Sequence, residues 1–76
     1  MARTVDKLIQ LLEDKYPTTL FSREDVEGEY IIEVSGTPEE QNEAERIIAD
    51  WALTEEFTVS ETIVNLPAYT IFRLSR

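Results

Sequence analysis

The chain has 76 residues, of which sixteen are acidic and seven basic, so its formal net charge is −9 at pH 7. A chain of this length forms one domain with a small core, and residues 1–76 are treated as a single domain. It contains no cysteine and no histidine, which excludes disulfides, thiolate chemistry, and the commonest general base and metal ligand. We therefore expect a protein that is not an enzyme and that holds no cofactor or metal.

The acidic residues are concentrated in the middle of the chain. Residues 24–61 hold thirteen acidic side chains against Arg46 alone, whereas the segments on either side are slightly basic. A negative surface repels the phosphates of nucleic acids, so direct nucleic-acid binding is not expected. A protein partner with a basic surface is favoured instead.

The first residues lack the apolar run of a signal peptide, and no stretch has the length and hydropathy of a membrane span. We expect a cytoplasmic protein that does not associate with membranes.

The first half of the chain predicts a helix followed by a hairpin. Apolar residues recur at helical spacing over 4–15, and Pro17 ends that helix because it restricts the residue before it. Residues 18–35 indicate a hairpin with a β-prone run at 18–22 and a turn at 25–28, where Asp and Gly stand as a type I turn prefers. Its second strand, 29–35, alternates apolar and polar side chains.

The segment from 37 to 53 carries the clearest helix signal in the chain. Thr37, Pro38 and Glu40 form the pattern of a capping box with proline at the first helical position. The residues that recur on one face are Ala44, Ile47, Ile48 and Trp51. We expect Trp51 in the core; a partner-binding anchor at the edge of the helix layer is the alternative.

The last part of the chain predicts a second hairpin. Alternation starts at Phe57 and shifts at Glu61, which predicts a bulge near 60–62 or a strand that begins only there. Residues 65–68 indicate a turn, and 69–75 the final strand.

This order of elements is α-β-β-α-β-β, which favours an α+β fold. The expected architecture is a two-layer sandwich: one four-stranded antiparallel sheet with both helices on one face. Moving the last strand to the front gives β-α-β-β-α-β, so a circularly permuted ferredoxin-like order is a natural candidate.

Two surfaces are candidates for binding a partner. The first is an acidic ridge, whose helical residues are spaced about 5–6 Å apart, of the same order as phosphates along a nucleic acid. Its predicted members are Glu39, Glu40, Glu43 and Asp50 of the second helix with Glu24, Asp25 and Glu27 of the first hairpin. The alternative interpretation is a solvated face, since Arg46 interrupts the row and surface helices commonly carry glutamate.

The second candidate surface is the sheet face turned away from the helices. That face should be mostly polar, yet Ile31, Tyr69 and Ile71 are expected on it. Contiguous exposed apolar side chains mark interfaces, so a homodimer or a partner contact is expected there.

The resulting hypothesis is a small acidic protein-binding domain. In its most concrete form it is an inhibitor, of the kind a virus or mobile element encodes, that occupies the basic nucleic-acid-binding groove of its target. The alternative is a structural or regulatory module, natural or designed, that self-associates through its sheet face.

Overall fold

The computed structural model describes residues 4–76 and contains two helices and four strands. The elements in chain order are α1 (Thr4–Lys15), β1 (Leu20–Val26), β2 (Glu29–Ser35), α2 (Pro38–Thr54), β3 (Thr58–Asn65) and β4 (Tyr69–Ser75). The predicted order α-β-β-α-β-β is confirmed, and both helices end within one residue of their predicted bounds.

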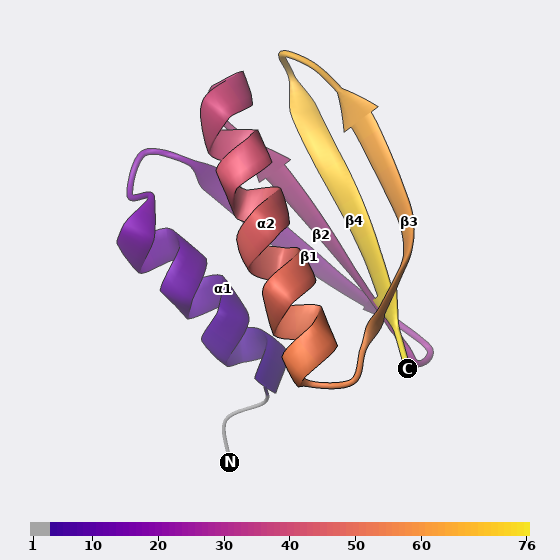
Figure 1. Cartoon of the computed structure of the whole chain (residues 1–76). Coiled ribbons are helices and arrows are strands. Elements are labelled where there is room, and N and C mark those ends of the chain that lie inside the picture. Colours follow the sequence, from indigo (N-terminus) through magenta and orange to yellow (C-terminus); the bar gives the residue numbers. More distant parts are fainter. Residues whose placement is uncertain (1–3) are drawn as a thin grey trace.

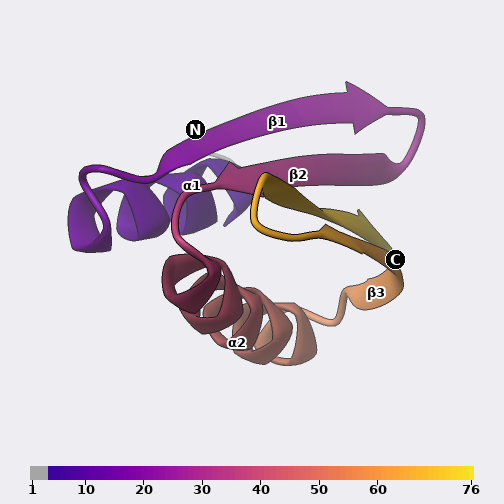
Figure 2. The same cartoon turned by 90° about the horizontal axis from the view of Figure 1, so that it is seen from above.

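The four strands form one antiparallel sheet in the order β1-β2-β4-β3. Both helices lie on the same side of this sheet, so the fold has two layers (Figures 1 and 2). The chain passes from β2 through α2 to β3, and β4 lies between those two strands. If the chain were permuted so that β4 preceded α1, it would pass from β4 through α1 to β1, and β2 would lie between those two strands. This is the split β-α-β arrangement of the permuted ferredoxin-like order.

The start of α2 is built by the predicted capping box. The Glu40 N–H donates to Thr37 Oγ1 at 3.1 Å, and the Thr37 N–H donates to Glu40 Oε1 at 2.9 Å. This second bond, to the Thr37 backbone, lowers the pKa of Glu40 below its usual value. A Cβ on Gly36 would lie 2.8 Å from Glu40 Oε1, so glycine leaves the room that the capping carboxylate occupies.

The C-terminal end of α2 uses a left-handed residue. The Phe57 N–H donates to the Ala52 carbonyl at 2.8 Å, and Glu56 between them has a φ of 64°. Glycine usually occupies this position because a Cβ is strained there.

The core lies between the helices and the inner face of the sheet. Its buried apolar residues are Val5, Leu8, Leu12, Ile32, Val34, Ala44, Ile48, Ala52, Phe57, Phe72 and Leu74. Trp51 is only partly buried and packs at the margin of this core, where its ring stacks on Phe57 with centroids 5.2 Å apart. The expectation of a core tryptophan is therefore confirmed in part.

The first hairpin differs from the prediction at its turn. β1 runs on to Val26, Asp25 pairs with Tyr30, and the loop is only Glu27–Gly28, where Gly28 has a φ of 77°. The predicted turn over 25–28 is wrong by one residue, because Arg23 and Asp25 lie on the same strand face and form a two-bond ion pair. This ion pair stabilises the extended conformation of the charged residues 23–25, so the strand continues through them.

The second hairpin confirms the predicted irregularity. The register of β3 against β4 shifts between Val59 and Glu61, which places a bulge at Ser60. Leu66, Pro67 and Ala68 connect the strands, with a cis peptide before the proline.

A buried glutamine ties this hairpin to α2. The Gln41 side-chain amide donates to the carbonyls of Gly36 and Pro67, both at 3.0 Å, and its oxygen accepts from the Thr70 hydroxyl at 2.6 Å. Gln41 and Thr70 are both buried. All the hydrogen-bonding groups of the buried amide therefore have partners, and the position of the β3–β4 loop depends on them.

Candidate interaction surfaces

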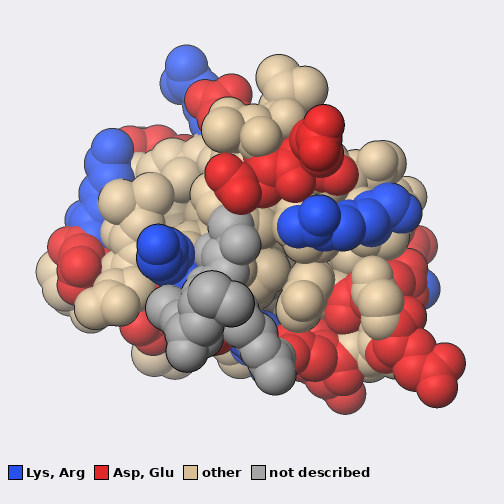
Figure 3. Space-filling model, turned by 90° about the horizontal axis from the view of Figure 1, so that it is seen from below, with Lys and Arg blue, Asp and Glu red and all other residues tan. Residues whose placement is uncertain are grey.

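The residues of the predicted acidic ridge do not form one continuous row. α2 begins beside the end of β2, whereas the β1–β2 loop with Glu27 lies beyond the other end of that strand (Figure 1). The fold thus separates Glu24, Asp25 and Glu27 from Glu39 and Glu40 at the start of α2. Figure 3 shows the hairpin end, where acidic side chains form separate groups with basic and uncharged side chains between them.

Asp25 and Glu40 of the predicted ridge are each held by several contacts within the chain. Asp25 accepts two hydrogen bonds from the Arg23 guanidinium, at 2.9 and 3.0 Å, and Arg23 also contacts Asp6 of α1. Glu40 belongs to the capping box and also accepts from the Thr18 hydroxyl at 3.4 Å. Neither carboxylate can leave its contacts for a partner without loosening the local structure.

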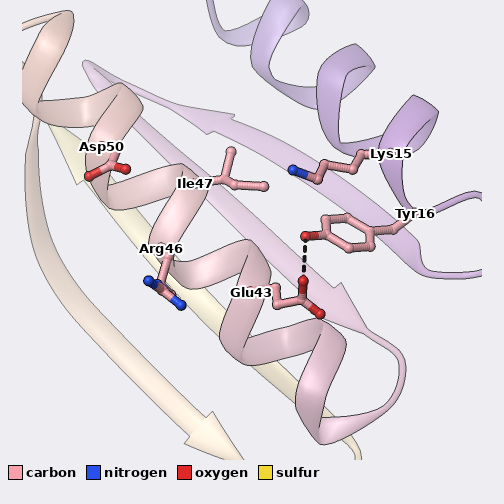
Figure 4. A pocket seen from close by; sticks show the side chains of 6 residues that line it. All are labelled: Lys15, Tyr16, Glu43, Arg46, Ile47 and Asp50. Carbon is pink, nitrogen blue, oxygen red and sulfur yellow. Dashed lines mark hydrogen bonds between the residues drawn. The ribbon is translucent and has the colours of Figure 1, made fainter.

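Glu43 and Asp50 line an open groove between α1 and α2, about 230 Å³ in volume. The Tyr16 hydroxyl donates to Glu43 Oε1 at 3.3 Å (Figure 4), and burial followed by the Glu43 charge raises the pKa of Tyr16. The other lining residues are Lys15, Arg46 and Ile47. With two acidic and two basic side chains, the groove carries no net charge, so this part of α2 is not a uniform row of negative charge.

The outer face of the sheet, turned away from the helices, carries a group of apolar side chains. Ile63 on β3 lies directly opposite Ile71 on β4, and Ile31 on β2 is diagonal to Ile71. Tyr69 follows on the same face of β4 two residues before Ile71. We call Ile31, Ile63, Tyr69 and Ile71 the sheet-face cluster. The structure therefore brings the three predicted sheet-face residues together and adds Ile63.

Carboxylates border the sheet-face cluster on several sides. Glu24 lies opposite Ile31 and Glu33 opposite Ile71 on the same face. Arg73 lies among them and is already shared between Glu29 at 3.9 Å and Glu61 at 3.8 Å. The outer face therefore combines an apolar centre with a negative border.

The apolar surface extends to the end of the second hairpin. Ile63, Val64 and Leu66 are 43%, 56% and 46% exposed. These three residues belong to the predicted second hairpin but were not among the predicted site residues. A signal was present in the sequence, because residues 62–72 contain no charged side chain in a chain that is 30% charged.

Other kinds of site find little support in the described part of the chain. Over residues 4–76, no group of three or more potential ligand side chains is placed to hold a metal ion. Neither of the two described helices has the length and hydropathy needed to cross a membrane. No model of a known protein family matches the chain, and a search of curated proteins finds no similar sequence.

Proposed function

We propose that this protein is a non-enzymatic protein-binding domain whose partner has a positively charged surface. The observation that carries the proposal is the outer face of the sheet, where the sheet-face cluster is bordered by Glu24, Glu33 and Glu61. Apolar side chains supply most of the free energy of association, and charges at the rim orient the partner and speed its approach. The partner surface that fits is an apolar patch framed by lysine or arginine.

The helices leave this face uncovered, and its central residues remain partly accessible. Ile31, Tyr69 and Ile71 are half-buried and Ile63 is exposed. A group of contiguous apolar side chains on an exposed face is typical of an interaction site. The net charge of −9 favours basic partners over acidic ones and over nucleic acids.

The proposal is tested by affinity capture from lysate with matched variants. The variant with Ile31→Lys and Ile71→Lys should lose the captured basic proteins, because lysine removes apolar area and repels a basic partner. The control, Glu39→Lys with Asp50→Lys, changes exposed residues on α2 and should retain them. Capture that survives the sheet variant, or that disappears only in the α2 variant, contradicts the proposal.

A second candidate is an inhibitor that occupies the nucleic-acid-binding groove of a basic protein. Its support is the exposed set Glu39, Glu43 and Asp50 on α2, with Glu39 and Glu43 four residues apart on one side of the helix. Reversal of all three to lysine should then abolish binding, and DNA or RNA should compete for the partner. The matched control reverses Asp6, Glu13 and Asp14 of α1 and should have much less effect.

A further inference from the structure

The two edges of the sheet differ in how they are protected from pairing with another strand. β1 carries consecutive charged residues, Arg23, Glu24 and Asp25, which is a common protection of an edge. β3 is the other edge, and none of the described helices and strands lies beyond it in Figure 1. After its bulge, residues 61–65 are exposed, and Glu61 is the one charged residue among them. The second half of β3 is thus an open edge.

We propose that β3 pairs in antiparallel fashion with β3 of a second copy of the chain, around a two-fold axis at Ile63. The two four-stranded sheets then form one sheet of eight strands with all helices on the same side. This inference concerns self-association and does not depend on the basic partner proposed above.

The position of the axis follows from the bulge. The uninterrupted part of β3 is residues 61–65, and Ile63 is its centre. With the axis there, Ile63 faces Ile63 of the second copy, Thr62 faces Val64, and Glu61 faces Asn65. Every residue after the bulge has a partner, and no two carboxylates are opposed. An axis at Glu61 would instead set two carboxylates face to face, which is destabilising.

The side-chain rows support the same register. Ile63 and Ile71 are opposite each other on the outer face. The two-fold axis would join these pairs into a continuous apolar row across both copies. Thr62 and Val64 are β-branched and exposed, and such residues favour extended strands that pair with a neighbour.

Electrostatic repulsion favours contact between two copies through the β3 edge over contact through the outer sheet face. Stacking two outer faces would bring the border carboxylates of both copies together, and among the paired strand residues only Arg73 on each face would compensate. Edge pairing involves only residues 61–65 of each copy, where the one carboxylate, Glu61, faces Asn65, so the carboxylates of the two copies stay apart. The net charge of −9 on each copy still repels at long range. Salt screens this repulsion, so dimerisation should strengthen as salt rises.

Analytical ultracentrifugation at low and high salt tests the proposal. We expect a monomer–dimer equilibrium that shifts toward dimer at high salt. Ile63→Lys places the lysines of the two copies opposite each other at the axis. Their repulsion should raise the dissociation constant of the dimer at least about tenfold. The control, Leu20→Lys, changes an exposed apolar residue on the β1 edge, 73% accessible, and should leave the equilibrium unchanged. Circular dichroism checks that both variants remain folded.

A cross-linking experiment tests the register directly, because the chain has no cysteine of its own. Opposed residues bring their Cβ atoms to about 5 Å, close to disulfide reach. In a glutathione buffer, Ile63→Cys should therefore form a covalent dimer much faster than Ser22→Cys on β1. A monomer at every salt and protein concentration overturns the proposal. So does a dimer that dissociates with Leu20→Lys but not Ile63→Lys, or equal cross-linking at both cysteines.

Discussion

Replacement of Gln41 by leucine tests how the second hairpin is held on α2. Leucine has a side chain of similar size but is apolar, so the substitution removes three hydrogen bonds, to Gly36, Pro67 and Thr70. Thr70 is only 3% exposed, and its hydroxyl would lose its acceptor. An unsatisfied buried polar group costs about 1–3 kcal/mol, and the two part-buried carbonyls add to this cost. A domain of this size has a stability of about 4–11 kcal/mol, so the loss is a large fraction of it.

The matched variant is Gln41→Leu combined with Thr70→Val. Removing both members of a buried hydrogen bond leaves no orphaned hydroxyl, so the double variant should recover about 1 kcal/mol relative to the sum of the two single changes. Urea unfolding followed by circular dichroism measures all four proteins of the cycle. If the two single effects simply add, Gln41 and Thr70 do not act as a pair, and the explanation of how α2 holds the hairpin is wrong.

Two further predictions concern the ends of α2. Glu56→Gly should raise the free energy of unfolding by about 1 kcal/mol, because Glu56 has a φ of 64° that glycine adopts without strain. Glu56→Ala removes the same charge but keeps the Cβ, so equal stability of the two variants in urea would refute this reasoning. The Thr37 contact lowers the pKa of Glu40, so the stability it contributes is present at neutral pH and is lost as pH falls through that lowered pKa. The free energy of unfolding, measured in urea at decreasing pH, should fall less steeply in Glu40→Gln than in the parent. Glu39→Gln, which lies outside the capping box, should change this slope less.

The sequence determined most of the local structure. The capping box at Thr37 and Glu40, the ends of both helices and the bulge beside Ser60 were all predicted, because each depends on residues only a few positions apart. The apolar periodicity also indicated which helix and strand faces form the core. The turn of the first hairpin was misplaced by one residue, since the ion pair of Arg23 and Asp25 supports a longer strand than propensity suggests.

The candidate surfaces depended on the tertiary structure. The strand order brought Ile31 of β2 beside Ile71 of β4 and left β3 at an edge, neither of which follows from spacing along the chain. It also separated the acidic residues of the first hairpin from those at the start of α2, so a continuous segment of sequence did not become a continuous surface. No pattern in the sequence marked Gln41, whose three partners come from two other parts of the chain. Contacts between distant segments decide which polar groups are buried, because the chain places those segments together only when it folds.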